Sequence, residues 1–205
     1  GVEIIGDMPI YASLDSADCW ANPQYFKLDD FYRPRVVAGV PPDLFSKTGQ
    51  LWGNPLYDYD RMQEDNYRWW KRRIEVSQKL FDLIRIDHFR GFEAYYQIPS
   101  SSKTAQTGSW VKGPGLKLFQ EIRKDLGEVR VIAEDLGFIT DDVRTLLKET
   151  NFPGMRVLQF GFDKDHDSEH APHNLEKNCV IYPGTHDNPP IKAWYQSLSK
   201  DRKSV

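Results

Sequence analysis

Three short segments of the sequence each place a carboxylate directly after an apolar run. The segments are Arg85-Ile86-Asp87-His88, Ala133-Glu134-Asp135 and Thr185-His186-Asp187-Asn188. Each apolar run predicts a buried strand, so Asp87, Glu134 and Asp187 are expected where three strands end. Carboxylates from the ends of different strands form the active site of a (β/α) barrel, and two carboxylates flanking a bond are used in glycoside chemistry. The pattern therefore predicts an enzyme that acts on sugars.

Arg85 stands two residues before Asp87, and alternate residues of a strand point to the same face. A cation this close keeps a carboxylate ionised. An ionised and rigidly held aspartate is suited to attack a sugar carbon as a nucleophile. The alternative is a purely structural ion pair, which this two-residue pattern alone does not distinguish.

Glu134 follows the apolar run Val131-Ile132-Ala133. Apolar surroundings raise the pKa of a carboxyl group, which suits a general acid that must hold its proton near neutral pH. The alternative is a buried glutamate that is paired with a neighbouring side chain.

Asp187 stands between His186 and Asn188. A donor, an acceptor and an amide in a row are enough to hold two hydroxyl groups of a sugar ring. The alternative is the polar start of a helix, because Pro189-Pro190 follows.

A metal site is a competing interpretation of the three carboxylates, because magnesium binds carboxylate oxygens. Arg85 and His88, beside Asp87, argue against a cation there. A second candidate is an acidic segment that contains histidines and is expected to be a solvated loop. Its residues are Asp163, Asp165, His166, Asp167, His170 and His173. Neither a metal nor a cofactor is predicted.

The elements that position these residues alternate between strands and helices. Strands are predicted at 2–5, 83–88, 129–133, 155–160 and 180–183. Helices are predicted at 65–81, 116–126 and 141–149, with a last one beginning near 189–190. Long loops are predicted at 20–62, which is irregular and rich in proline, and at 99–114. This alternation indicates the α/β class with a parallel sheet.

The predicted strands are too few to close a barrel of eight. Either further strands lie outside this chain, or the sheet is open and doubly wound. No Gly-rich phosphate loop favours the second option. The sequence opens on a strand pattern without a Met, Gly1-Val2-Glu3-Ile4-Ile5, which favours a piece of a longer protein.

The composition is that of an ordinary globular protein, with 40% hydrophobic and 28% charged residues among 205. A net charge of -3 gives no reason to expect nucleic acid or an anionic membrane surface as a partner. No apolar run approaches the roughly 20 residues of a membrane helix. The 2 cysteines imply no disulfide framework and suit a reducing cytoplasm.

Aromatic residues are abundant, at 13% of the chain. Flat rings either fill a core or line a groove where they stack on a ligand. Trp52 and Tyr57 lie in a polar stretch rich in Gly, Asn and Pro, so they are better groove candidates than Trp69 or Trp70.

Several stretches, read in order, resemble those of one known family. They are Gly6-Asp7-Met8-Pro9-Ile10-Tyr11, Ser16-Ala17-Asp18-Cys19-Trp20, Val37-Ala38-Gly39-Val40-Pro41-Pro42-Asp43, Thr48-Gly49-Gln50-Leu51-Trp52-Gly53-Asn54-Pro55-Leu56-Tyr57, Arg85-Ile86-Asp87-His88-Phe89-Arg90-Gly91, Ala133-Glu134-Asp135-Leu136-Gly137 and Gly184-Thr185-His186-Asp187-Asn188. The chain resembles the 4-α-glucanotransferases of the amylomaltase (disproportionating enzyme) family, glycoside hydrolase family 77. The Pro-Pro-Asp loop and the tail that follows it separate this family from the wider α-amylase relatives.

The resemblance implies a fold and a set of roles. Residues 1–205 would be the central portion of a longer chain, a partial (β/α)8 TIM barrel within one catalytic domain, whose long loop at about 20–62 covers the substrate. Asp87 matches the nucleophile, Glu134 the general acid/base, and Asp187 the third carboxylate, which binds and distorts the sugar. The positions that match substrate contacts are Asp7, Asp43, Trp52, Arg85, His88 and His186.

The implied reaction is a retaining transfer of α-1,4-glucan segments to a new acceptor sugar, with the two carboxyl groups of Asp87 and Glu134 roughly 5–5.5 Å apart. The partner is an α-1,4-glucan or maltooligosaccharide, with neither nucleic acid nor a membrane involved. The expected location is a bacterial cytoplasm, with a plastid as the second choice. The alternatives are an α-amylase-type hydrolase, a non-catalytic glucan-binding fragment and a metal-dependent barrel enzyme.

Overall fold

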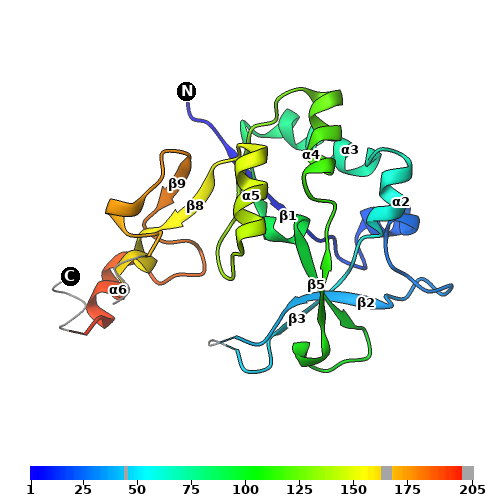
Figure 1. Ribbon diagram of the computed structural model, residues 1–205, viewed down its shortest axis with the longest axis horizontal. Coiled ribbons are helices and arrows are strands. Elements are labelled where there is room, and N and C mark those ends of the chain that lie inside the picture. The colour runs from blue at the N-terminus through cyan, green and yellow to red at the C-terminus, as the bar shows by residue number, and fades with distance from the viewer. Residues whose placement is uncertain (44–45, 163–167, 200–205) are drawn as a thin grey trace.

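The computed structural model describes residues 1–43, 46–162 and 168–199, and its strands form three sheets (Figure 1). A three-stranded sheet has the order β1-β4-β7, which are Ile5–Pro9, Leu83–Asp87 and Val131–Ala133. A two-stranded sheet joins β8 (Gly154–Val157) to β9 (Cys179–Tyr182). A four-stranded sheet has the order β3-β2-β5-β6, which are Gln50–Pro55, Val36–Val40, Ala94–Pro99 and Ser109–Lys112.

Helices lie between many of these strands. The α-helices are α1 (Ala17–Ala21), α2 (Tyr59–Glu64), α3 (Arg68–Leu80), α4 (Gly115–Leu126), α5 (Asp141–Thr150) and α6 (Ile191–Ser197). Short 3-10 helices are η1 (Pro23–Tyr25), η2 (Phe89–Phe92), η3 (Ala105–Thr107), η4 (Leu158–Phe162) and η5 (Pro172–Asn174). The three helices predicted at 65–81, 116–126 and 141–149 are confirmed as α3, α4 and α5. None of the helices within the described ranges is long and apolar enough to span a bilayer.

The parallel sheet β1-β4-β7 brings together residues that are distant in sequence. The register of β1 against β4 pairs Asp7 with Arg85. Along β4, Ile84 and Ile86 are buried, while Arg85 and Asp87, which alternate with them, remain partly accessible. The alternation predicted from sequence is thus confirmed, with the apolar face in the core and the charged face at the site.

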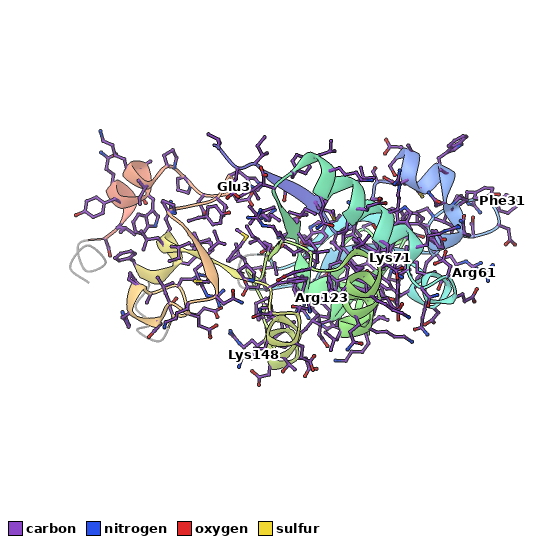
Figure 2. All side chains as sticks on the ribbon, turned by 90° about the horizontal axis from the view of Figure 1, so that it is seen from above. Glu3, Phe31, Arg61, Lys71, Arg123 and Lys148 are labelled. Atoms are coloured by element: carbon purple, nitrogen blue, oxygen red, sulfur yellow. The ribbon has the colours of Figure 1, made fainter. Side chains whose placement is uncertain are left out.

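Helices α3 and α4 pack side by side over the core. Trp70, Ile74 and Phe119 are each 1% exposed or less, so these helices are anchored by large apolar side chains. At their edges Lys71 Nζ lies 2.6 Å from Asp125 Oδ2 (Lys71 is labelled in Figure 2). The core, and not this exposed ion pair, supplies most of the stabilisation.

The first strand begins later than predicted. The sequence placed it at 2–5, but β1 runs over Ile5–Pro9, so Asp7 lies within the strand. Gly6 follows the predicted strand in sequence, but in the structure it lies inside β1 and packs there against Phe81. A Cβ at position 6 would lie 2.0 Å from Cδ2 of Phe81, so only glycine fits there.

The segment 20–62 is not the irregular loop that the sequence predicted. It contains β2 and β3, which pair antiparallel, and β2 also pairs with β5. The predicted loop 99–114 likewise contains β6, paired antiparallel with β5. The signal was present in the apolar run Val36-Val37-Ala38-Gly39-Val40, but scattered prolines obscured it. The four-stranded sheet is therefore a framework for the residues on this segment.

Tyr57 is a core residue and not a groove residue, which corrects the prediction. Its ring is 0% exposed, and its hydroxyl donates to Ile10 O (2.7 Å) and accepts from Ala12 N–H (3.2 Å). The polar neighbours in sequence were misleading, because a buried tyrosine needs only a partner for its hydroxyl. Trp52 is 38% exposed, as a groove residue should be, and Trp69 and Trp70 are buried.

The strands β8 and β9 form a parallel pair of their own, drawn apart from β1 in Figure 1. One link to the three-stranded sheet is the hydrogen bond from Ala133 N–H to Pro153 O (2.9 Å). The strand predicted at 155–160 ends at Val157, after which the chain turns into η4. The described residues thus form a mixed α/β structure with no closed barrel.

Candidate active site

A charged row crosses the face of β1 and β4. Arg85 donates from Nη1 to Asp7 Oδ1 (2.6 Å) and from Nη2 to Asp87 Oδ1 (2.8 Å). The side chain of Arg85 is 15% exposed, whereas those of Asp7 and Asp87 are 57% and 44% exposed. The guanidinium is therefore the fixed centre of the row, and it orients both carboxylates while leaving them accessible. The prediction that Arg85 and Asp87 share a face is confirmed.

Glu134 follows β7 and is buried, at 9% exposure. One carboxyl oxygen accepts the His88 N–H (2.7 Å) and the other accepts the Leu136 N–H (2.8 Å). These two donors and Arg85 lower its pKa, but burial outweighs them and the charge of Asp87 adds to it, so that the pKa of Glu134 is raised to about 7. Glu134 is thus divided between its protonated and ionised forms near neutral pH, as general acid/base work requires.

His88 connects the two carboxylates. It follows Asp87 directly and adopts a left-handed backbone with φ 55°, which turns its N–H toward Glu134. Non-glycine residues in this conformation are uncommon and are concentrated at functional sites. Burial, helped by Arg90, lowers the pKa of the His88 ring to about 4, so the ring is neutral at pH 7. Its Nε2 is buried and has no hydrogen-bond partner among the described residues, and its ring lies 4.8 Å from that of Trp52.

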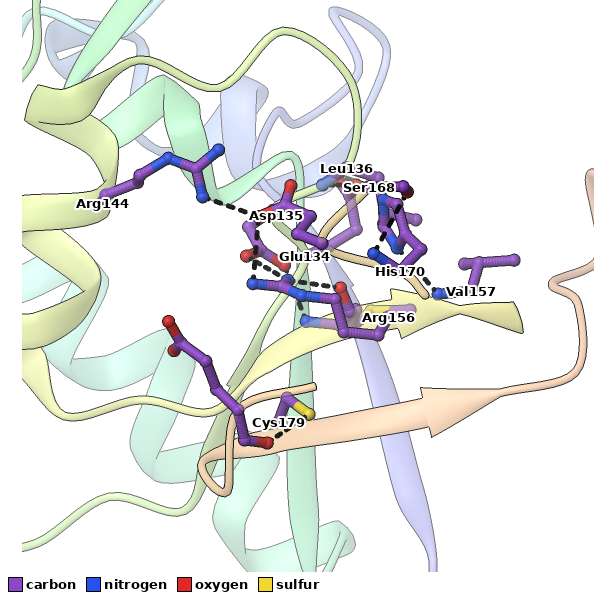
Figure 3. A network of polar contacts seen from close by, with 12 residues as sticks. Glu134, Asp135, Leu136, Arg144, Arg156, Val157, Ser168, His170 and Cys179 are labelled. Carbon is purple, nitrogen blue, oxygen red and sulfur yellow. Dashed lines mark hydrogen bonds and ion pairs between the residues drawn. The ribbon is translucent and has the colours of Figure 1, made fainter. Parts of the chain in front are cut away.

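Behind Glu134 lies a buried ion pair that the sequence analysis missed (Figure 3). Asp135 is 2% exposed and accepts from Met155 N–H (2.6 Å) and from Arg156 Nη1 (2.8 Å). The same Met155 offers its sulfur to Nε of Arg85 (3.4 Å). The residue after Glu134 is thus tied to β8, and β8 touches the arginine that orients Asp87.

A sequence signal for this pair did exist. Arg156 stands between apolar residues in a predicted strand, and a buried arginine needs a carboxylate partner. Its guanidinium also lies 3.3 Å from Glu169, which extends the network toward Arg144. Asp135 and Arg156 are therefore positioning residues for the end of β7 and not candidates for contact with substrate.

His186 and Asp187 are placed differently. Their side chains are 75% and 80% exposed, and His186 Nε2 lies 3.4 Å from Asp187 Oδ2. The turn that carries them is closed by Asn188, whose Oδ1 accepts from the N–H of Thr185 (2.8 Å). Within the described part of the chain, no hydrogen bond or ion pair joins Asp187 to Asp87 or Glu134. The structure therefore groups Asp7, Arg85, Asp87, His88 and Glu134, and leaves His186 and Asp187 on the separate β8-β9 unit.

The metal interpretations find no support in the residues described. In those ranges, no three His, Cys, Asp or Glu side chains are arranged to hold a metal ion. Of the acidic segment with histidines, Asp163, Asp165, His166 and Asp167 lie outside the described residues. His170 accepts the Val157 N–H on Nδ1 (3.1 Å), which is a structural role.

A hollow of about 370 Å³ opens between β2, β3, β6 and the segment 136–138. Its lining includes both residues whose N–H groups bind the carboxyl of Glu134, as well as Asp43 and Trp52. Asp43, which ends the Pro-Pro-Asp sequence, accepts the Ser46 N–H on its Oδ1 (2.6 Å). Asp43 and Trp52 are thus brought to the Glu134 side of the site.

The chain is similar to known proteins over its whole length. The profile of the family described as 4-alpha-glucanotransferase, glycoside hydrolase family 77, matches residues 1–205. The chain belongs to this family. The resemblance recognised from the sequence motifs is confirmed.

Individual members of the 4-alpha-glucanotransferase family are similar along almost the whole chain. A 4-alpha-glucanotransferase of Streptococcus pneumoniae is 54% identical over 200 residues, which are 98% of this chain and 40% of that protein. A chloroplastic/amyloplastic 4-alpha-glucanotransferase of Solanum tuberosum is 52% identical, over 100% of this chain and 35% of its own length. The chain therefore spans well under half the length of these relatives.

Two solved structures of amylomaltases share the fold. The amylomaltase of Streptococcus agalactiae in complex with acarbose superposes with a TM-score of 0.96 at 46% identity, covering 100% of this chain and 41% of that one. The amylomaltase of Corynebacterium glutamicum gives a TM-score of 0.80 at 21% identity, over 94% of this chain and 27% of that one, and shows the fold alone.

Proposed function

We propose that this protein is a 4-α-glucanotransferase, which moves segments of α-1,4-glucan to a new acceptor sugar with retention of configuration. The observation that carries the proposal is the pairing of a buried carboxyl, Glu134 with its pKa raised to about 7, and an accessible Asp87 held by Arg85. One carboxyl is suited to hold a proton and the other to attack. This division of roles is the one that retaining glycoside chemistry uses.

In the first step an Asp87 carboxylate oxygen attacks the anomeric carbon, and the bond from that carbon to the glycosidic oxygen breaks. Glu134 gives its proton to the departing oxygen, which leaves as a sugar hydroxyl. The products are a glycosyl ester on Asp87 and an ionised Glu134. Arg85 keeps Asp87 oriented for the attack, and the neutral ring of His88 supplies a buried nitrogen beside the same sugar.

In the second step the acceptor takes the place of the departed chain. Glu134 removes the proton of an acceptor hydroxyl, whose oxygen attacks the anomeric carbon and displaces Asp87. Two inversions return the original configuration. We assign to Asp7, His186 and Asp187 the binding of the sugar at the cleavage point, and to Asp43 and Trp52 the guidance of the acceptor.

The five parallel strands fit consecutive strands of a (β/α)8 barrel, to which the sheets β1-β4-β7 and β8-β9 would both belong. Residues 1–205 would then be part of one catalytic domain. Cys19 and Cys179 are both free thiols, which suits a reducing compartment such as a bacterial cytoplasm.

The test is incubation of the native full-length protein with maltotriose, with the products resolved by chromatography. Glucose appearing together with maltooligosaccharides longer than maltotriose supports transfer. Glucose and maltose with nothing longer would indicate a hydrolase instead. Binding of maltotriose without any product would indicate a glucan-binding protein, and loss of products on chelation would indicate a metal enzyme.

A further inference from the structure

The chemistry proposed for Glu134 indicates which sugars lie in the hollow that His88 and Leu136 line. Leu136 and His88 both donate N–H groups to Glu134, and both line the hollow. A general acid protonates the leaving oxygen, so sugars attached to that oxygen lie on its side of the broken bond. The hollow is therefore where the leaving chain departs and where the acceptor chain later lies. This assignment rests on the proposed function.

Aromatic rings are exposed around this hollow. Trp52 and Trp110 are 38% and 39% exposed, and Phe138 is 70% exposed. Trp52 contacts the ring of His88 and so lies next to the catalytic groups. Trp110 stands on β6 and Phe138 follows the turn at Gly137, so both approach the hollow from other elements. A large apolar ring left open beside a catalytic carboxyl is suited to stack on the flat face of a sugar.

A buried arginine contacts both the ring of Trp110 and the main chain of Phe138. The side chain of Arg90 is 6% exposed, and its guanidinium carbon lies 3.9 Å from the centroid of the Trp110 ring. Arg90 Nη1 donates to the carbonyl oxygen of Phe138 (2.9 Å), and Nη2 lies 3.9 Å from Glu93. Tyr96 packs edge-on against Trp110, with 5.2 Å between the two ring centroids. The Trp110 ring and the main chain of Phe138 are thus held in place before any sugar binds.

We propose that Trp110 and Phe138, held by Arg90, form a subsite for the second and later sugars of the acceptor chain. The first acceptor sugar lies at Trp52, beside His88 and Glu134. A glucose acceptor reaches only this first position, whereas maltotriose extends to the two further rings. The subsite therefore makes the enzyme favour oligosaccharide acceptors over glucose, and Phe138 is a specificity-determining residue.

The experiment uses the native full-length protein with α-maltosyl fluoride as the donor and either glucose or maltotriose as the acceptor. Phe138→Ala and Trp110→Ala are expected to raise the acceptor KM for maltotriose roughly 3- to 10-fold each, the range of one aromatic contact. The KM for glucose and the rate of the first step, measured as the initial burst of fluoride before an acceptor is added, should stay unchanged. Phe138→Tyr keeps the ring and should retain the wild-type preference.

Trp20→Ala is the matched control, because Trp20 is 85% exposed and does not line this hollow. Equal losses with glucose and maltotriose would overturn the proposal, since they would mean that the rings only support Glu134. An unchanged preference in both alanine variants would overturn it as well. If the wild type transfers to neither acceptor, the proposed function has failed, and that result is distinct from an altered preference.

Discussion

The two halves of the candidate site are built in different ways. On β1, β4 and β7, each functional side chain is fixed by contacts within the chain: Arg85 holds Asp87, and two N–H groups hold Glu134. On the β8-β9 unit, Asp187 is 80% exposed and its side chain meets only its neighbour His186 among the described residues. The groups assigned to bond breaking are thus organised in advance, and the groups assigned to sugar binding are open to solvent. Preorganisation is worth most where charge develops, which is at the nucleophile and the acid.

The largest effect is expected from Asp87→Asn, which removes the nucleophile of the organised half. Transfer activity on maltotriose should fall by at least about 10⁴-fold, because the amide of asparagine cannot form the glycosyl ester proposed for Asp87. Product formation followed by chromatography measures it. Activity within tenfold of the wild type would remove Asp87 from its role.

Glu134→Gln tests the other member of the organised pair. We expect a loss of roughly 10²- to 10⁴-fold with maltotriose, whose leaving oxygen needs a proton. The first step with α-maltotriosyl fluoride should be spared, since fluoride leaves without one. In the wild type, the first step should decline as pH rises above about 7, where Glu134 loses its proton. A first step that is flat from pH 6 to 9 would contradict the assignment.

Asp135→Ala tests whether the ion pair of Asp135 with Arg156 positions Glu134 without taking part in the reaction itself. It leaves the guanidinium of Arg156 buried beside the end of β7, so the free energy of unfolding should fall by about 3 kcal/mol. kcat should fall with it, because Glu134 is adjacent, while KM changes little. Denaturant unfolding and steady-state kinetics measure the two effects. Asp135→Asn keeps one acceptor oxygen and should recover part of both; a variant as stable and active as the wild type would show that this ion pair positions nothing.

The raised pKa of Glu134 also predicts a pH dependence of stability. The folded protein holds this proton up to a pKa of about 7, whereas the unfolded chain releases it near the ordinary glutamate pKa of 4.5. The folded state therefore binds more protons in this window, and its free energy of unfolding falls as pH rises through it, by on the order of 3 kcal/mol. Glu134→Gln should lack this slope when unfolding is measured from pH 4 to pH 8. An identical slope in both proteins would place the titrating group elsewhere.

The smallest stability effect is expected from Asp187→Asn in the open half. The side chain is exposed, so the free energy of unfolding should change by no more than about 0.5 kcal/mol. Activity should nevertheless decline, because the sugar at the cleavage point loses a carboxylate. Thermal unfolding and maltotriose kinetics, run beside Asp135→Ala, compare the two halves. A large loss of stability would mean that Asp187 is anchored like Glu134.

The difference between the halves also explains what the sequence could predict. Asp87 and Glu134 were located because apolar runs precede them, and period-two alternation assigns one face of β4 to the core and the other to the site. The run at 36–40 is also apolar, yet the prolines on both sides of it concealed its strand. One of the two strands that pair with it, β5, begins 54 residues after position 40, so this pairing could not be read from the local sequence. Tyr57 was misplaced because its burial depends on Ile10 and Ala12, which are distant in sequence. Local patterns thus gave the strand ends, while long-range antiparallel pairing and the ion pair of Asp135 with Arg156 depended on tertiary contacts.

The most direct test of the central claim is to trap the glycosyl ester. Glu134→Gln in the native full-length protein would be incubated with α-maltotriosyl fluoride, digested and analysed by peptide mass spectrometry. Because the variant forms the ester without an acid but cannot activate an acceptor, one maltotriosyl group should accumulate on the peptide that contains Asp87. Fluoride release with no adduct, or an adduct on any other carboxylate, would contradict the assignment of Asp87 and Glu134 as nucleophile and acid/base.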